Sequence, residues 1–302
     1  MQKLGIIGLG DIAAKAYLPI YGAKEDVEFH LYTRNKERLA SISRQYRFDN
    51  IHHSLESLIE SGIKGAFVHS STESHFEIVH TLLVNNIHVY VDKPITYDFD
   101  SSKKLMELAK KNGLWLMVGF NRRYAPAYQK LKELQNPNMI IMQKNRNSQP
   151  SDIRTFVFDD YIHVLDTMRY LFPVNIEDIV VSGRKVGNTL YHAIVQFIGK
   201  GCNAIGIMNR DSGTTEERLE VMCPNEKRVA INVSEVIQYQ DRNELKIVGS
   251  DWEPTLHKRG FYQIVDEFIH TVNNDEAPKI SASDLLQTHE ICEIVVSKLE
   301  QL

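Results

Sequence analysis

Near its start the chain reads Leu4-Gly5-Ile6-Ile7-Gly8-Leu9-Gly10-Asp11-Ile12-Ala13, an apolar strand-like run that passes through two glycines into a helical pattern. In this order Gly8 permits a tight turn, and Gly10 lets the backbone approach a pyrophosphate. Ala13 is small enough for the helix to pack on the strand. The free N–H groups and the positive dipole end of that helix favour phosphate. The stretch therefore predicts a dinucleotide-binding turn.

Strand-like and helix-like patterns alternate through residues 1–119. Apolar, β-branched runs predict strands at Leu4–Gly8, Val27–Thr33, near Ile51, Gly65–Ser70, His88–Asp92 and Leu114–Phe120. Helical patterns lie between them: Lys36–Arg44 capped by Asn35, Glu73–Val84, and Ser101–Asn112 capped by Asp100 and stopped by Gly113. Alternating strands and helices indicate a parallel sheet with helices on both faces. Residues 1–119 are therefore predicted to form a doubly wound α/β domain of the Rossmann type.

The pattern changes in residues 120–302, which are predicted to form a second domain of α+β class. Strand-like runs lie at Met139–Lys144, Asp178–Val181, Ala193–Ile198, Ala204–Met208, Leu219–Cys223, Val229–Val233 and Glu244–Val248. Short turns between consecutive strands indicate an open, predominantly antiparallel sheet. Helices are expected at about Asp160–Leu171, Lys258–Val272 and Ser283–Leu299, the last capped by Ser281 or Ser283. The final helix, residues 283–300, belongs either to this domain or packs back on the first.

Lys93 follows the apolar run His88-Val89-Tyr90-Val91-Asp92 and precedes Pro94. Because Pro94 lacks a backbone N–H and restricts the residue before it to extended conformations, the lysine is held at the end of a strand. Ligands of open parallel sheets bind at the carboxyl ends of the strands. Lys93 is therefore either a surface cation on a turn or a catalytic group, and the glycine turn upstream favours the catalytic interpretation.

Asp159 and His163 are four residues apart in a helical pattern, so both side chains are expected on one side of a helix. A carboxylate beside an imidazole orients it, and the pair can serve as a base near neutral pH. The alternative is an ordinary polar pair on a helix surface. Two neighbouring carboxylates have simpler interpretations, Asp160 as a helix cap and Asp166 as a structural group.

The end of the second predicted strand decides between NAD and NADP. An acid about 20 residues after the glycines suits the ribose hydroxyl of NAD, whereas an arginine suits the 2′-phosphate of NADP. The chain has Thr33 and Arg34 at this point and no acid, and Lys36 or Arg38 could assist. The alternative is that Arg34 is a solvated turn residue. We expect NADP to be preferred.

Composition excludes several classes of partner. The chain of 302 residues has 35 Lys+Arg against 39 Asp+Glu and no basic cluster, which argues against nucleic acid and anionic membranes. No apolar run approaches the roughly 18 residues that span a bilayer. The three cysteines are far apart, and the histidines lack metal-ligand spacing. We therefore expect a cytoplasmic protein with a small-molecule substrate and no metal.

With these elements placed, the sequence resembles the Gfo/Idh/MocA family of NAD(P)-dependent oxidoreductases, nearest to its MviM-like branch. The resemblance covers essentially the whole chain. Five ordered motifs carry it: Gly8-x-Gly10-x-x-Ala13, Thr72-Glu73-Ser74-His75, Asp92-Lys93-Pro94, Gly119-Phe120-Asn121-Arg122-Arg123-Tyr124, and Asp159 through His163 to Asp166. The resemblance implies a Rossmann domain followed by a domain with a large open antiparallel sheet.

The resemblance also implies roles for individual residues. It makes His163 the acid/base, Lys93 the group that binds the substrate hydroxyl, and Asp159 the residue that orients or assists. Cofactor contacts are expected at Gly8, Gly10, Asp11, Ile12, Thr33, Arg34, Ser70, His75 and Lys93. For His75 the alternative is a surface residue at the start of a helix.

Two departures from the family pattern affect the expected site. The glycine pair that usually precedes the aspartate–histidine helix is replaced by Thr155-Phe156-Val157-Phe158, and Ser70-Ser71 stands where a proline is usual. The function expected first is a dehydrogenase or reductase of a sugar, polyol or related compound. The alternative is a non-catalytic cofactor-binding sensor, which the missing glycines favour. An uncovered sheet face between Ile176 and Val248 predicts a homodimer or higher homo-oligomer.

Overall fold

The computed structural model describes residues 1–302, which form two compact units. The first unit comprises Met1–Gly119 and Ile264–His289, and the second comprises Phe120–Gln263 and Glu290–Leu302. Residues 264–282, which were expected in the second domain, therefore belong with the first unit. The final helix, whose placement was left open, is divided after His289 between the two units. The chain passes between the units within two helices, α10 (Phe261–Asn274) and α11 (Ala282–Glu300).

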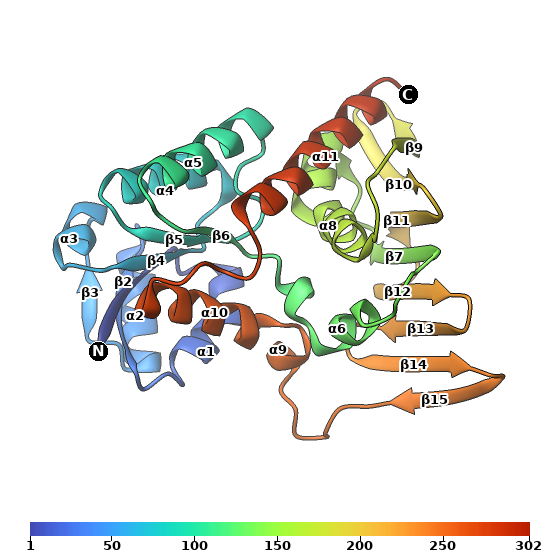
Figure 1. Cartoon of the computed structure of the whole chain (residues 1–302). Coiled ribbons are helices and arrows are strands. Elements are labelled where there is room, and N and C mark those ends of the chain that lie inside the picture. The colour runs from blue at the N-terminus through green and yellow to red at the C-terminus, as the bar shows by residue number, and fades with distance from the viewer. The chain divides into compact units, whose positions relative to one another are not determined.

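A six-stranded parallel sheet forms the centre of the first unit (Figure 1). Its strands are β1 (Gln2–Ile7), β2 (Val27–Tyr32), β3 (Asn50–His52), β4 (Gly65–Val68), β5 (His88–Val91) and β6 (Leu116–Val118). Their order is β3-β2-β1-β4-β5-β6, the doubly wound order in which the chain reverses direction next to β1. The predicted Rossmann domain is confirmed, and each of its six predicted strands is present.

The helices of the first unit follow from caps and apolar stripes. They are η1 (Ala13–Tyr17), α1 (Leu18–Tyr21), α2 (Lys36–Tyr46), α3 (Leu55–Glu60), η2 (Thr72–Ser74), α4 (His75–Val84) and α5 (Phe99–Lys111). Asn35 caps α2 as predicted, since its side chain accepts a hydrogen bond from Arg38 N at 2.9 Å. The predicted cap of α5 at Asp100 is wrong: Asp98 accepts from Ser101 N at 2.7 Å, which places Asp100 inside the first turn.

Helix α10 belongs with the first unit because its apolar side chains complete that unit's core. Phe268 is fully buried, and its ring lies 4.8 Å from Phe67 of β4 and 5.8 Å from Tyr90 of β5, measured between ring centroids. The expected single helix Lys258–Val272 is broken into α9 (Thr255–Lys258) and α10. Gly260 lies between them with φ of +81°, a left-handed conformation that favours glycine.

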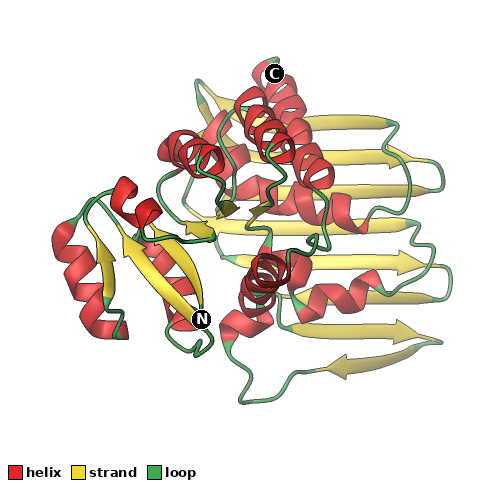
Figure 2. Cartoon of the chain, turned by 60° about the vertical axis from the view of Figure 1, so that its left-hand side comes forward, coloured by secondary structure: helices red, strands yellow, loops and turns green.

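The second unit is built on a nine-stranded sheet (Figure 2). Its strands are β7 (Met139–Asn147), β8 (Ser151–Asp152), β9 (Asp178–Val186), β10 (Thr189–Gly199), β11 (Cys202–Ser212), β12 (Glu216–Cys223), β13 (Glu226–Ile231), β14 (Glu235–Gln240) and β15 (Asn243–Ile247). Every paired neighbour is antiparallel except β7 and β11, which are parallel. The expected antiparallel domain is confirmed, with β8 and β14 as additional strands.

Helices cover one face of this sheet. They are η3 (Asn121–Tyr124), α6 (Pro126–Lys132), α7 (Ile153–Thr155), η4 (Phe156–Tyr161), α8 (Ile162–Leu171), α9 and the second half of α11. Helix α8 packs on β7 and β11, and Tyr161 at the end of η4 donates a hydrogen bond to Gly206 O at 2.7 Å. The packing of α8 is close, since a Cβ built at Gly206 would lie 2.5 Å from the Met168 side chain. These contacts fix the helix that carries the predicted catalytic pair.

Candidate active site

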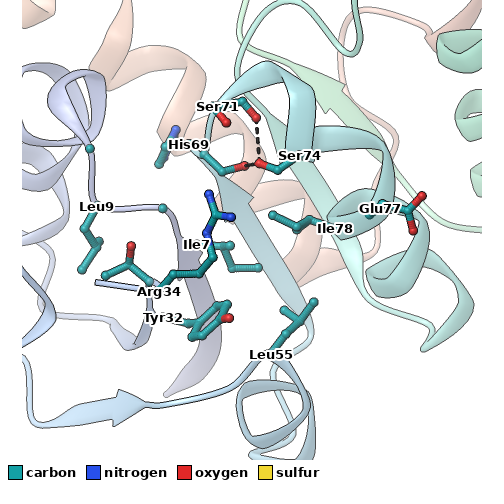
Figure 3. Close-up of a pocket in the computed structure, with 14 residues that line it drawn as sticks. Ile7, Leu9, Tyr32, Arg34, Leu55, His69, Ser71, Ser74, Glu77 and Ile78 are labelled. Atoms are coloured by element: carbon teal, nitrogen blue, oxygen red, sulfur yellow. Dashed lines mark hydrogen bonds between the residues drawn. The ribbon is translucent and has the colours of Figure 1, made fainter. Parts of the chain in front are cut away.

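A cavity of about 380 Å³ lies at the carboxyl ends of β1, β2 and β4 in the first unit (Figure 3). It is lined by Ile7, Gly8, Leu9, Gly10, Tyr32, Thr33, Arg34, Leu55, His69, Ser70, Ser71, Ser74, Glu77 and Ile78. Five predicted cofactor residues therefore share one wall: Gly8, Gly10, Thr33, Arg34 and Ser70. They come together because the ends of parallel strands meet at one edge of the sheet.

The two glycines of the turn differ in what surrounds them. Gly8 has φ of +86°, and a Cβ built on it would lie 2.5 Å from the backbone N of Ser70, so the turn requires glycine here. At Gly10 no atom lies within 4 Å of the position of a Cβ. The space beside Gly10 is open to a phosphate group, which is the fit that a dinucleotide requires.

The helix after the turn begins with a π-helical segment, η1, and its first residues are accessible. Asp11 is exposed and pairs with Lys15 at 2.8 Å, and Ile12 is 42% exposed. Tyr17, at the end of η1, is fully buried, and its hydroxyl lies 2.8 Å from the hydroxyl of Tyr90 in β5. This contact ties the phosphate-binding helix to the strand that leads to Lys93.

Arg34 follows β2 and extends toward the turn that carries Ser71 and Ser74 (Figure 3). It is exposed, and no acid stands beside it at the end of β2. Arg38, one of two residues that could assist Arg34 with a 2′-phosphate, donates from Nε to the carbonyl oxygen of Leu9 at 2.9 Å. It thereby braces the glycine turn. The acid in the cavity wall, Glu77, comes from α4.

His75 is buried, so the alternative of a surface residue is wrong. Its Nε2 lies 3.0 Å from Ser70 O and its Nδ1 lies 3.0 Å from Pro94 O. Both partners are backbone carbonyl oxygens within hydrogen-bond distance of the ring. His75 therefore connects the turn after β4 to the residue that follows Lys93. It is not among the residues that line the cavity.

His69 is buried in the core of the first unit. Its Nε2 lies 2.8 Å from the Tyr21 hydroxyl, and its ring stacks on Tyr17 with centroids 3.9 Å apart. Burial, helped by the nearby charge of His75, lowers the pKa of His69 to about 3. The imidazole is therefore neutral at physiological pH and adds no charge to the cavity wall.

Lys93 follows β5 at the carboxyl edge of the sheet, as predicted, and is partly exposed. The residue before it, Asp92, is buried, and its Oδ1 accepts hydrogen bonds from Lys93 N at 3.0 Å and from the Tyr17 hydroxyl at 3.4 Å. Burial raises the pKa of the Asp92 carboxyl, while the charges of Lys93 and His75 oppose that rise. Asp92, Tyr17 and His75 thus hold the backbone on both sides of the lysine.

Asp159 and His163 lie in the second unit, in η4 and α8 respectively. We expected both side chains on one side of a regular α-helix, but Asp159 lies in the π-helical segment η4, which has i→i+5 hydrogen bonds. Both side chains are nevertheless partly exposed, whereas the residues on either side of each are buried. The segment that replaces the glycine pair is itself well packed, because Phe156, Val157 and Phe158 are fully buried.

The carboxylates near this pair have structural partners. Asp160 does not cap a helix, which corrects that interpretation; it is buried and accepts from Lys144 and Arg146. Asp166 binds Arg123, with Nη2 to Oδ1 at 2.6 Å and Nε to Oδ2 at 2.9 Å, and both side chains are buried. Asp166 is therefore a structural carboxylate, as expected.

Sequence reasoning missed a buried group of charges next to Asp160. Arg122 binds Glu217 through Nε and Nη2, each at 2.7 Å, and the Tyr128 hydroxyl donates to Glu217 Oε1 at 2.6 Å. Lys144 is buried beside them. A signal was present in the strand Met139–Lys144, where Ile140, Met142 and Lys144 alternate onto the same face. A charged residue in an otherwise apolar series marks a buried polar network.

The structure contains no group of three or more His, Cys, Asp or Glu side chains able to hold a metal ion. No helix is long and apolar enough to cross a membrane.

Comparison with known proteins gives the family. Residues 2–120 match the oxidoreductase family with the NAD-binding Rossmann fold, GFO_IDH_MocA, and residues 126–243 match the YceM-like C-terminal domain. The putative oxidoreductase YceM of Salmonella typhimurium is 30% identical over 298 residues, covering 96% of each chain. The myo-inositol 2-dehydrogenase of Thermotoga maritima is 23% identical, covering 94% of this chain and 92% of the relative.

Among solved structures, the dehydrogenase MviM from Clostridium difficile superposes with a TM-score of 0.92 at 32% identity, covering 99% of each chain. The same fold thus extends over both units. This chain belongs to the Gfo/Idh/MocA family of oxidoreductases with an NAD-binding Rossmann fold.

Proposed function

We propose that the protein is an NADP-dependent dehydrogenase or reductase of a sugar, a polyol or a related hydroxy or keto compound. The observation that carries the proposal is the cavity that collects Gly8, Gly10, Thr33, Arg34 and Ser70 at the ends of three parallel strands. The relative named as a myo-inositol 2-dehydrogenase supports a polyhydroxylated substrate.

The preference for NADP rests on the end of β2. Arg34 is exposed at the cavity, and a guanidinium is well suited to a phosphate. An acid at this position would repel the 2′-phosphate, and the chain has none there. Glu77 is the acid in the wall, but it is exposed on α4.

The proposed chemistry divides the work between cofactor and protein. When bound, the nicotinamide supplies the acceptor or donor of the hydride. His163 takes the proton of the substrate hydroxyl or returns it, with Asp159 orienting the imidazole. Lys93 donates a hydrogen bond to the reacting oxygen and stabilises the negative charge that develops on it. The proposal requires all three to act on one substrate.

We further propose a homodimer or higher homo-oligomer assembled through the sheet of the second unit. The face opposite α8 carries several isoleucines in neighbouring registers, with Ile141 beside Ile205 and Ile194 beside Ile207. They are only partly buried, and Ile194 is 38% exposed. Contiguous apolar surface of this kind is usually covered by a partner. The three cysteines are free, which supports a cytoplasmic location.

The proposal is tested by incubating the protein with NADPH and a panel of keto-sugars and keto-inositols and following the loss of NADPH absorbance. We expect at least one compound to be reduced, with NADH less effective. Tight binding of NADPH without turnover of any compound would instead support a non-catalytic sensor.

A further inference from the structure

We propose that the substrate carries an anionic group, a carboxylate or a phosphate, which Arg146 and Arg210 bind beside Asp159. This inference rests on the proposed function and deepens it, because it names the class of substrate that the same site takes. A sugar acid or a sugar phosphate has the required combination of hydroxyls and negative charge.

The first support is the placement of the two arginines. Side chains alternate along β7, so Lys144 and Arg146 share the face of the sheet that the helices cover. Arg210 of β11 lies on the same side, since its guanidinium stacks over the ring of Phe156 in η4 at 5.5 Å. Asp159 belongs to this same π-helical segment, and its charge acts on the guanidinium of Arg210.

The second support is the balance of charge on this face. Glu217 is matched by Arg122 in a bidentate pair. Asp160, by contrast, accepts hydrogen bonds from two cations, Lys144 and Arg146. Arg146 Nε lies 2.9 Å from Asp160 Oδ2, and Arg146 Nη2 lies 3.2 Å from Asp160 Oδ1. Arg210 adds a fourth cation. Asp160 and Glu217 therefore lie beside four cations, of which Arg146 and Arg210 are partly exposed, while Asp159 is partly exposed and Asp152 is exposed at the rim.

The surroundings disfavour the charged forms of two of these cations, Lys144 and Arg210. Burial, reinforced by the charge of Arg122, lowers the pKa of Lys144 to about 7, although Asp160 and Glu217 oppose the change. Burial also lowers the pKa of Arg210; Arg146 contributes in the same direction, whereas Asp160, Asp159 and Asp152 oppose the change. Glu216 is not part of this group, because it is exposed and alternates with Glu217 along β12 onto the other face of the sheet. An anionic ligand beside Arg210 would favour its charged form.

The third support is the unused donor capacity of the arginines. Arg210 donates from Nη1 to Ser151 Oγ at 2.9 Å, but its Nε is buried and has no hydrogen-bond partner. Arg146 uses Nε and Nη2 on Asp160, and its side chain is 33% exposed. The Nε of Arg210 is covered by the protein, so the donors left for a ligand are Arg146 Nη1 and Arg210 Nη2, which make no hydrogen bond within the protein and are not buried. A planar guanidinium recognises carboxylate and phosphate oxygens best.

The anion could in principle belong to the substrate or to the cofactor. The substrate is favoured because the arginines lie beside Asp159 on the face of the sheet that the helices cover, and Arg146 lies in β7 on the same face as the buried Lys144. The cofactor phosphates already have a matching place at Gly10 and Arg34 in the first unit. The experiment below separates the two sources.

The test measures binding of paired probes to the full-length protein by calorimetry with NADP⁺ present. The probes are D-glucuronate, D-gluconate and D-glucose 6-phosphate, each compared with D-glucose, together with myo-inositol. We expect at least one acidic probe to bind about 10- to 100-fold more tightly than D-glucose, as for hydrogen bonds to a charged group. Arg210→Gln and Arg146→Gln should each remove most of that preference and leave NADPH affinity within about twofold.

Two further variants keep the test decisive. Arg210→Lys retains the charge but loses the planar fork, so it should fold like the parent and still weaken acid binding. Arg184→Gln is the matched control: Arg184 lies in β9 of the same sheet, is exposed and faces Asp211 at 3.7 Å, and its change should alter nothing.

A parent protein that binds no acid more tightly than its neutral counterpart overturns the inference, whichever compounds it turns over. Loss of NADPH affinity in the Arg210 variants, with acid discrimination unchanged, would overturn it by assigning the anion to the cofactor. Arginine-dependent acid binding without turnover of any probe would support the anion site while contradicting the proposed dehydrogenase.

Discussion

The change Gly10→Ala tests the role of the glycine turn in cofactor binding without lowering the stability of the fold. No atom lies within 4 Å of the position of the added methyl group, and Gly10 is not among the glycines with positive φ. The protein should therefore fold normally, and fewer unfolded conformations should make it more stable by about 0.4–1 kcal/mol. The methyl group would occupy the space in which the backbone approaches a pyrophosphate, so cofactor binding should suffer.

The expected loss in affinity follows from the contacts that the methyl group blocks. Hydrogen bonds between backbone N–H groups and a charged phosphate contribute about 1.5–3 kcal/mol each, so loss of one corresponds to about 10- to 100-fold weaker binding. The matched comparison is Gly8→Ala. Its methyl group would lie 2.5 Å from Ser70 N in a left-handed backbone, and the strain should cost about 1–3 kcal/mol of stability.

Fluorescence titration with NADPH and urea unfolding measure the two quantities on the same samples. We expect Gly10→Ala to lose affinity at full stability and Gly8→Ala to lose stability. A Gly10→Ala protein that binds NADPH as tightly as the parent would refute the assignment of this turn to the pyrophosphate.

Three other predictions concern the cofactor, the buried charges and the assembly. Arg34→Ala should remove about 1–3 kcal/mol from NADPH binding and leave NADH nearly unchanged; equal affinity of the parent for both cofactors would contradict it. Burial raises the pKa of Glu217, but the charge and hydrogen bonds of Arg122, together with Lys144 and Tyr128, outweigh it and lower that pKa to about 2. This carboxylate therefore contributes about 3 kcal/mol of stability at neutral pH, which is lost as pH falls from about 4.5 toward 2. Urea unfolding across this range should show a free energy of unfolding that falls steeply as the pH is lowered, and this fall should be smaller in Glu217→Gln. An equally steep fall in the variant would refute the contribution of Glu217. Ile207→Lys, on the uncovered sheet face, should shift the oligomer toward monomer in light scattering, and a parent of monomer mass at micromolar concentration would contradict the assembly.

The sequence was sufficient where the signals were local. The alternation of strands and helices and the turn at Gly8 predicted the first sheet, because a parallel order with right-handed crossovers leaves few topologies. Asn35 begins α2 and Gly113 follows the end of α5 as expected, Gly113 with φ of +67°. The cap at Asp100 failed because Asp98, two residues earlier, offers the same chemistry.

The remaining features depend on contacts that no local pattern reveals. Phe268 returns to the core of the first unit from far along the chain. The π-helical segments at Tyr17 and Asp159 leave no periodic signal, and both carry residues of the candidate site. The partners of Lys144 come from η3, η4 and β12, which only the folded chain brings together.

The most direct test of the account measures how fast three variants oxidise NADPH in the presence of a compound that the parent protein reduces. The variants are His163→Ala, Lys93→Met and the combination of the two. The single change at His163 should lower kcat by about 10²–10⁴-fold, and the change at Lys93 should also lower it severely while NADPH binding stays within a few-fold. Because the two groups act as one unit, the double variant should lose far less than the product of the single losses. Near-normal turnover by His163→Ala, or losses that multiply, would contradict the assignment of Lys93 and His163 to one catalytic site.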